Sequence, residues 1–239
     1  MKRTRKLFAP LLSLILLLSM ALPAFAAPSG HWAAPVYEKW VQAGVISDTE
    51  DFEKIDAAVT RAELVHILDE VLDWSWDLIA EDTFRDLVYQ EDGSTYWSDM
   101  ELYTDILKAV GAGVIGGTPE HNLLPFQPVT RQDTCVILRQ AFQLPDAQGA
   151  QPFADDSEIS DYARQAVYAV SAPGYVNGKE GHRFDPQGTI TYAELSVILN
   201  NLAADYPQVQ QRAGQTKTDW IYDRSTEDVY KRQSQRMSV

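Results

Sequence analysis

The apolar residues of this chain recur with helical spacing in three separate stretches. They occupy positions i, i+3, i+4 and i+7, which lie on one face of an α-helix, with a threonine opening the second copy. The members are Leu64, Ile67, Leu68 and Val71 in the first copy, Thr134, Ile137, Leu138 and Ala141 in the second, and Leu195, Ile198, Leu199 and Leu202 in the third. The pattern predicts three amphipathic helices, each with one buried face.

Each predicted helix begins with a threonine that is followed three residues later by an acid. The pairs are Thr60 and Glu63, Thr130 and Asp133, and Thr191 and Glu194. Threonine with glutamate at this spacing forms a capping box, in which each side chain accepts a hydrogen bond from the backbone N–H of the other residue. The aspartate of the second copy is a shorter variant that still favours a helix N-terminus.

A second helical stripe precedes each of these helices and ends at a glycine. Gly44, Gly113 and Gly174 lie 16, 17 and 17 residues before the three threonines. A glycine at the end of a helical stripe is the expected left-handed C-terminal cap. An apolar pair follows each glycine, and residues 121–125 and 182–186 share a loop with a histidine and a proline.

Each copy therefore reads as helix, glycine turn, short extended segment, loop and capped helix. One helix pair is too small to bury its own apolar faces, so the copies must pack together. We predict a mainly α fold of three tandem helix–loop–helix repeats at residues 27–73, 83–144 and 152–206. The second repeat is preceded and interrupted by an insert around residues 73–100, in which Trp74, Trp76 and Trp97 are either packed or available for sugar stacking.

The two ends of the chain differ from the repeats. Residues 1–26 combine four basic residues, an apolar run at 7–22 and the ending Ala24-Phe25-Ala26, which indicates a signal peptide. The alternative is an uncleaved anchor, but the run is short for a span of roughly 20 residues. We expect a secreted mature chain that begins at Ala27 and has no membrane span.

The C-terminal residues 207–239 are polar and lack periodicity, which predicts a disordered tail. Residues 228–233 resemble the translated end of a sequencing adaptor, which is a processing scar rather than natural sequence. On this interpretation the natural protein continues into a C-terminal cargo domain that is missing here.

Composition narrows the function classes. The 239 residues include 45% hydrophobic and 23% charged residues, enough apolar surface for a folded core. The formal net charge is −14, and it becomes −18 when residues 1–26 are removed, so nucleic acid is excluded as a partner. A single cysteine, Cys135, rules out an intramolecular disulfide, and its apolar neighbours predict a buried thiol.

Catalytic and metal-binding motifs are absent from the sequence. There is no Gly-x-Ser-x-Gly elbow, phosphate loop or His-Glu-x-x-His motif, and the four histidines lack zinc-site spacing. Asp155-Asp156 lacks the acidic ladder of a calcium loop. A glycosidase carboxylate pair cannot be tested by spacing alone. We expect no enzyme, cofactor or metal within the repeats.

The three copies resemble the S-layer homology family over residues 29–206. The residues that carry the match are His31-Trp32-Ala33, Gly44-Val45-Ile46 and Thr60-Arg61-Ala62-Glu63 in the first copy, Phe84-Arg85-Asp86, Gly113 to Gly117 and Thr130-Arg131-Gln132-Asp133 in the second, and Phe153-Ala154-Asp155, Gly174 to Gly178, Phe184-Asp185-Pro186 and Thr191-Tyr192-Ala193-Glu194 in the third. The resemblance implies a pseudo-threefold bundle with ligand grooves between neighbouring repeats.

The resemblance also implies the ligand, a secondary cell-wall polysaccharide or other peptidoglycan-linked glycan that often carries a pyruvate ketal. The arginine of the Thr-Arg-Ala-Glu motif contacts it in the family, which here designates Arg61 and Arg131. An arginine fork can hold a carboxylate, a helix start presents free N–H groups to an anion, and glycine lets the backbone approach a sugar.

The third copy departs from the motif, because Tyr192 replaces the arginine. The grooves of Arg61 and Arg131 are therefore the candidate sites, and the third is either inactive or rebuilt around aromatic stacking. Both arginines have the alternative of a solvated first-turn residue, and Trp32 has the alternative of a core residue. The candidate ligand-binding residues are Trp32, Thr60, Arg61, Glu63, Gly117, Thr130, Arg131, Asp133, Gly178 and Tyr192.

These observations predict a protein at the surface of a bacterium that anchors itself non-covalently to the cell wall through this glycan. The alternative is a self-assembling or adhesive surface-layer protein, in which the repeats mediate protein contacts.

Overall fold

The computed structural model describes residues 30–47, 54–81, 83–87, 100–216 and 218–219. The predicted signal peptide at 1–26, Trp97 and the segment 228–233 lie outside these residues. Within the described part the chain forms helices and no strand, which confirms the mainly α fold class. The helices are α1 (Ala34–Gln42), α2 (Arg61–Leu72), α3 (Met100–Gly111), α4 (Arg131–Ala141), α5 (Asp161–Ser171), α6 (Tyr192–Leu202) and α7 (Pro207–Ala213), with three-residue 3-10 turns at Trp76–Leu78, Asp156–Glu158 and Glu180–His182.

The three capped helices begin where the sequence predicts. Thr60, Thr130 and Thr191 precede α2, α4 and α6, and each threonine side chain accepts a hydrogen bond from the N–H of the acid three residues later. α2 and α6 carry complete capping boxes. In α4 only the threonine half is formed, because the aspartate is one methylene shorter than glutamate.

The helices that precede them end in glycine turns, as predicted. Gly44, Gly113 and Gly174 have φ of 74°, 71° and 86°, the left-handed region in which glycine is unstrained. The next N–H turns back onto the helix: Val45 donates to Trp40 at 3.0 Å, Val114 to Ala109 at 2.9 Å, and Tyr175 to Val170 at 3.1 Å. Each apolar pair after the glycine is consequently buried.

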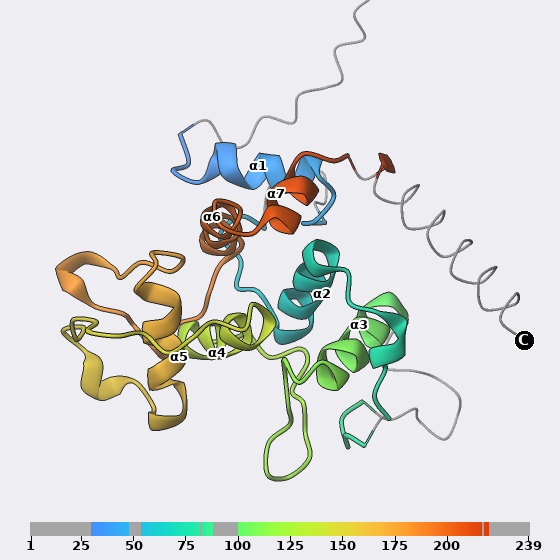
Figure 1. The fold of residues 1–239 in the computed structure, drawn as a ribbon, viewed down its shortest axis with the longest axis horizontal. Helices are drawn as coiled ribbons and strands as arrows, with labels where there is room; N and C mark the ends of the chain where they lie inside the picture. Colours follow the sequence, from blue (N-terminus) through green and yellow to red (C-terminus); the bar gives the residue numbers. More distant parts are fainter. Residues whose placement is uncertain (1–29, 48–53, 82, 88–99, 217, 220–239) are drawn as a thin grey trace, which may run out of the picture.

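Helices pair between copies rather than within them. α2 packs against α3, α4 against α5, and α1 against α6 (Figure 1). Each pair therefore joins the capped helix of one copy to the first helix of the next, and the pair of α1 and α6 joins the two ends of the array. The predicted apolar stripes of α2, α4 and α6 lie at these contacts, and all are buried except the half-buried Ala141.

A closed ring of backbone hydrogen bonds connects the extended segments that lead into α2, α4 and α6. The Val59 N–H donates to the Ile190 carbonyl at 2.9 Å, and the Val129 N–H donates to the Val59 carbonyl at 2.9 Å. The Ile190 N–H closes the ring on the Val129 carbonyl at 3.2 Å. One residue of each copy takes part, an arrangement that supports the implied pseudo-threefold bundle; the symmetry itself stays a prediction.

The predicted buried thiol is confirmed. Cys135 on α4 is fully buried, and burial raises the pKa of its thiol to about 12. A thiol in this state is protonated at neutral pH and has the packing role of a small apolar residue. None of the helices in the described part is long and apolar enough to span a bilayer.

An ionic cluster that the sequence did not indicate lies buried between α2 and α3. The Lys108 ammonium is 1% exposed and donates to Asp69 and, at 2.9 Å, to Asp105. His66 Nδ1 lies 2.8 Å from the second oxygen of Asp105. Lys108 also lies 5.3 Å from the centre of the exposed Trp76 ring, whereas Trp74 packs against the core.

The buried carboxylates have unequal proton affinities. Burial and the nearby negative charge of Asp105 raise the pKa of Asp69 to about 7. Burial alone would lower the pKa of Lys108, but the hydrogen bonds to Asp69 and Asp105 outweigh burial and raise this pKa. The ammonium therefore stays charged at neutral pH and compensates the ionised Asp105 and the partly ionised Asp69.

The prediction that disorder begins at residue 207 is wrong over α7. Val209 and Arg212 are 0% and 1% exposed, and α7 packs on α2 and α6. Arg212 donates to the Ala43 carbonyl at 2.6 Å and pairs with the Glu70 carboxylate at 2.8 Å. The seven-residue helix is too short to show an apolar period, and its main anchor is a charged side chain.

We predict that Lys108→Met lowers the free energy of unfolding by about 3 to 5 kcal/mol, because the buried Asp105 carboxylate and the partly ionised Asp69 lose their cation. Urea unfolding of the full chain at neutral pH measures this loss. Arg139→Met is the matched control, since it removes the surface ion pair with Asp146 and costs about 1 kcal/mol or less. Equal losses in the two variants would contradict a stabilising role for the cluster.

We also predict that Asp69→Asn changes how stability depends on pH. Because the pKa of Asp69 rises from 3.8 to about 7 on folding, the folded chain keeps a proton that the unfolded chain releases between these values. The contribution of this proton to stability is complete below the pKa that Asp69 has in the unfolded chain. It is lost as the pH rises through the pKa that Asp69 has in the folded chain. The stability of the parent relative to Asp69→Asn should therefore fall between about pH 4 and pH 7. Urea unfolding across this range tests it, and a constant difference would refute it.

Candidate functional site

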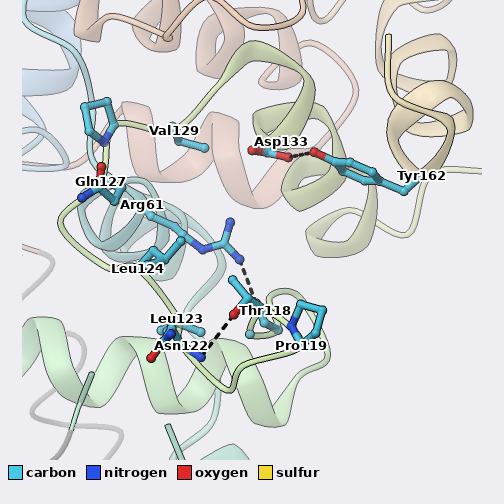
Figure 2. A pocket seen from close by; sticks show the side chains of 13 residues that line it. Arg61, Thr118, Pro119, Asn122, Leu123, Leu124, Gln127, Val129, Asp133 and Tyr162 are labelled. Atoms are coloured by element: carbon cyan, nitrogen blue, oxygen red, sulfur yellow. Dashed lines mark hydrogen bonds between the residues drawn. The ribbon is translucent and has the colours of Figure 1, made fainter. Parts of the chain in front are cut away.

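A pocket of about 700 Å³ opens beside Arg61, at the junction of three copies (Figure 2). Arg61 comes from α2 of the first copy, Asp133 from α4 of the second, and Tyr162 from α5 of the third. The glycine turn and loop of the second copy form the remaining wall. The lining residues are Arg61, Gly116, Gly117, Thr118, Pro119, Asn122, Leu123, Leu124, Gln127, Pro128, Val129, Asp133 and Tyr162.

The Arg61 guanidinium is only partly hydrogen bonded. One terminal nitrogen donates to the Gly116 carbonyl at 3.0 Å. Its Nε is buried and has no hydrogen-bond partner within the described part of the chain. Burial lowers the pKa of Arg61, and the charge of Asp133 partly opposes this. An arginine still remains protonated at neutral pH, so the pocket contains a cation with unused donors.

Tyr162 stands at the edge of the same pocket with 64% of its surface exposed. Its hydroxyl donates to Asp133 Oδ1 at 2.7 Å (Figure 2). The same hydroxyl accepts a hydrogen bond from the Gln132 amide at 3.0 Å. Burial of the hydroxyl and the neighbouring Asp133 carboxylate raise the pKa of Tyr162 to about 12. The side chain is thus a neutral, fixed ring at the pocket edge.

A second pocket, of about 230 Å³, lies at the corresponding junction beside Arg131. Its lining residues are Trp32, Arg131, Tyr175, Val176, Asn177, Gly178, Lys179, Glu194, Val197, Ile198 and Asn201. Trp32 is 65% exposed, so the alternative of a core residue is wrong. Trp32 takes the place that Tyr162 has in the first pocket, and the two precede their glycine caps, Gly44 and Gly174, by the same twelve residues.

Arg131 differs from Arg61 in that each of its three guanidinium nitrogens has a hydrogen-bond partner. It is 3% exposed, and its Nε and one terminal nitrogen donate to the carbonyls of Phe184 and Asn177 at 2.9 and 3.0 Å. The other terminal nitrogen pairs with Glu194 Oε1 at 2.9 Å. Neither arginine is the solvated first-turn residue of the alternative interpretation.

At the third junction Tyr192 is buried, with 4% of its surface exposed. Its hydroxyl is hydrogen bonded to Glu63, and burial raises its pKa well above the usual value. Lys54 Nζ lies 5.7 Å from the ring centre. A ring so covered offers no face to a sugar, which contradicts both the aromatic-stacking alternative and the choice of Tyr192 as a ligand-binding residue.

The predicted role of the helix starts as anion sites is also wrong. The first two N–H groups of α2 donate to the carbonyls of Gln127 and Pro125, at 3.0 and 2.9 Å. The first two of α4 and α6 bond in the same way to the loops of the next copy, at Gly188 and Pro186 and at Ala57 and Ile55. The threonine cap takes the third N–H of each helix, so none of these groups remains for a ligand.

The capping residues themselves stand apart from the two pockets. Thr60, Glu63 and Thr130 line neither of them, and their side chains satisfy helix caps. They position the neighbouring arginines rather than a ligand, because the arginine is the first residue of the helix that each threonine caps.

Gly117 and Gly178 line the pockets, and packing explains why they are glycines. A Cβ at Gly117 would lie 2.6 Å from the Phe84 ring, and one at Gly178 would lie 3.0 Å from the Phe153 ring. Two acids, Asp86 and Asp155, hold the loop opposite each phenylalanine by accepting two backbone N–H bonds each, at 2.7 to 2.8 Å. These hydrogen bonds give the Asp155 carboxylate a role in holding the loop that requires no metal ion.

The structure therefore brings the predicted site residues together in two groups. Arg61, Gly117 and Asp133 share one pocket, and Trp32, Arg131 and Gly178 share the other. Sequence reasoning missed Tyr162 and Lys179. The equal spacing to the glycine caps could have identified Tyr162 as the counterpart of Trp32. Among the described residues, no three or more histidine, cysteine, aspartate or glutamate side chains are grouped to hold a metal ion.

Two segments of the chain match the family model of the S-layer homology domain, residues 92–135 and 152–196. These segments lie within the second and third predicted repeats, and the resemblance is confirmed for those two. The first copy lies outside both segments, so its resemblance to the family stays a prediction.

Similar proteins carry the same region within much longer chains. An amylopullulanase of Thermoanaerobacterium thermosulfurigenes is 28% identical over 178 residues, which cover 72% of this chain and 9% of that protein. The exoglucanase XynX of Acetivibrio thermocellus is 27% identical over 179 residues, which cover 72% of this chain and 15% of that protein. A surface-layer 125 kDa protein of Lysinibacillus sphaericus is 24% identical over 208 residues, which cover 82% of this chain and 17% of that protein. The chain thus spans less than a fifth of the length of these relatives.

We predict that Gly117→Ala destabilises the chain by about 1 to 3 kcal/mol, because the added methyl group overlaps the Phe84 ring and the Asn122 carbonyl. Gly116→Ala is the matched control, since a Cβ there meets no atom within 4 Å. Thermal unfolding of both variants measures the difference. Similar melting temperatures for the two variants would contradict this packing role.

Proposed function

We propose that this chain attaches a secreted protein non-covalently to the bacterial cell wall, by binding a cell-wall polysaccharide in the Arg61 and Arg131 pockets. The observation that carries the proposal is the composition of these pockets. Each pocket combines an arginine from one copy with a glycine-containing wall and an acid from the next copy. An exposed aromatic ring from the remaining copy completes it.

This combination suits a sugar polymer. The rings of Trp32 and Tyr162 are exposed, and aromatic faces pack against the apolar C–H faces of sugars. Backbone carbonyls and side-chain amides of the walls can bond hydroxyl groups, and arginine can bond an acidic substituent such as a pyruvate ketal. Two pockets on one chain can engage one polymer together, which strengthens weak individual contacts.

The relatives support attachment rather than catalysis as the shared role. Two are named as enzymes and one as a surface-layer protein, yet all share this region. A segment common to such different proteins does not depend on one reaction. The S-layer homology domain is a non-catalytic anchoring module, and the natural cargo of this chain would then be a further domain of the same polypeptide.

The charge of the chain determines how binding occurs. A protein with a net charge of −14 does not attract an acidic polymer over long distances. The pocket contacts must therefore supply the binding energy at short range.

We predict that the full chain sediments with purified, protein-free wall sacculi. Arg61→Ala combined with Trp32→Ala should weaken this binding about tenfold or more, a loss of ~1.4 kcal/mol, because it removes one lining side chain from each pocket. These positions are preferable to Arg131, whose buried hydrogen bonds also support the fold. Arg139→Ala combined with Arg164→Ala is the control, since these arginines line neither pocket.

Two results would refute the proposal: absence of the chain from the sacculus pellet, or unchanged binding by the Arg61→Ala and Trp32→Ala variant. The similarity to a surface-layer protein supports self-assembly as a second candidate function. Sedimentation of the chain without sacculi separates the two, because only self-assembly gives a pellet there.

A further inference from the structure

The acid at the third position of each capped helix faces the first residue of the capped helix of the preceding copy. Glu194 faces Arg131, Glu63 faces Tyr192, and Asp133 lies near Arg61 in the same pocket. Two of these acids are glutamates and one is an aspartate. Each glutamate is bonded to the side chain that it faces, whereas the shorter aspartate leaves Arg61 without an ion pair among the described residues.

Glu194 is long enough for two tasks. Its Oε2 accepts the backbone N–H of Thr191 at 3.1 Å and completes the capping box, while Oε1 pairs with Arg131 at 2.9 Å. Lys179, the other cation of this pocket, lies 2.6 Å from Asp185 and 4.0 Å from Glu194. Both cations of the Arg131 pocket are therefore paired with carboxylates of the chain.

Asp133 is one methylene shorter and completes no capping box. One of its oxygens accepts the Tyr162 hydroxyl at 2.7 Å. Within the described part of the chain, no carboxylate lies within ion-pair distance of Arg61. The buried Nε of Arg61 has no partner in this part of the chain, and one terminal nitrogen of its guanidinium donates to the Gly116 carbonyl.

Formal charge does not explain the difference between the pockets, because each contains both signs. Arg61 with Asp133 line one, and Arg131 and Lys179 with Glu194 line the other. The difference is that Arg61 has unused N–H donors beside a pocket of about 700 Å³. A carboxylate needs such donors for a two-point bond with a guanidinium.

We propose that Asp133 determines the specificity of the two pockets, by leaving Arg61 free to bind the carboxylate of an acidic sugar. The Arg131 pocket, with its arginine held by Glu194, accepts a neutral sugar ring against Trp32. This division of roles rests on the proposed glycan binding, and it deepens that proposal by assigning a sugar class to each pocket.

The test uses the full chain labelled with ¹⁵N and the side-chain Nε–Hε NMR signals of Arg61 and Arg131, assigned with Arg61→Lys and Arg131→Lys. The probes are methyl glucuronoside and methyl glucoside, which differ in a carboxylate. We expect the glucuronoside to shift the Arg61 signal and leave the Arg131 signal in place, and the glucoside to leave the Arg61 signal in place. An unmoved Arg61 signal, or an Arg131 signal that moves with the glucuronoside, overturns the proposal.

Exchanging the two acids provides a second test. Asp133→Glu should weaken glucuronoside binding at Arg61 about tenfold, because a glutamate can pair with that arginine as Glu194 pairs with Arg131. Glu194→Asp should make the Arg131 signal respond to the glucuronoside. Glu63→Asp is the matched control, since it makes the same change opposite Tyr192, where no arginine is present. Unchanged affinity in Asp133→Glu, with an unmoved Arg131 signal in Glu194→Asp, overturns the assignment.

Sacculus sedimentation distinguishes failure of this inference from failure of glycan binding itself. If the parent chain binds sacculi while the Arg61 signal ignores the glucuronoside, the specificity assignment fails and wall anchoring stands. If the parent chain does not bind sacculi, wall anchoring fails whatever the NMR titration shows.

Discussion

The ring of hydrogen bonds among Val59, Val129 and Ile190 is the contact on which the remaining architecture depends. Each of these residues lies just before a capped helix, so the ring fixes the starts of α2, α4 and α6 together. It places the first residue of each capped helix beside the loop of the next copy. The Arg61 and Arg131 pockets consequently form at the junctions between copies, and each is lined by residues of all three. Figure 1 shows the same relation at the level of helices, which pair between copies.

The same geometry removes the backbone from ligand recognition. Because the loop carbonyls of the next copy accept the first N–H groups of each helix, a ligand meets side chains and loop carbonyls instead of a helix dipole. Recognition then depends on which arginine donors the protein itself leaves unused. A difference of one methylene between Asp133 and Glu194 is sufficient to change how many arginine N–H donors remain unused.

Polar contacts hold the periphery of a fold that has a single cysteine. The Lys108 cluster joins α3 to α2, and Arg212 joins α7 to α2 and to the end of α1. Both cations are almost fully buried and bonded to carboxylates. Removing one member leaves an uncompensated charge, so these contacts restrict how the helices can shift against one another.

The sequence by itself determined the helices, their threonine caps, the glycine turns, the buried stripes and Cys135, because each depends on residues within one or two helical turns. The family resemblance also designated Arg61, Gly117 and Asp133, which line one pocket, and Trp32, Arg131 and Gly178, which line the other. Only the tertiary structure decided that Arg131 is held by Glu194, 63 residues away, that Trp32 is exposed, that Tyr192 is buried and that Tyr162 completes a pocket. It also decided that α7 is ordered, through one valine and one buried arginine. Hydrophobic periodicity carries no information on which side chains of different copies meet, and those meetings determine which donors remain free for a ligand.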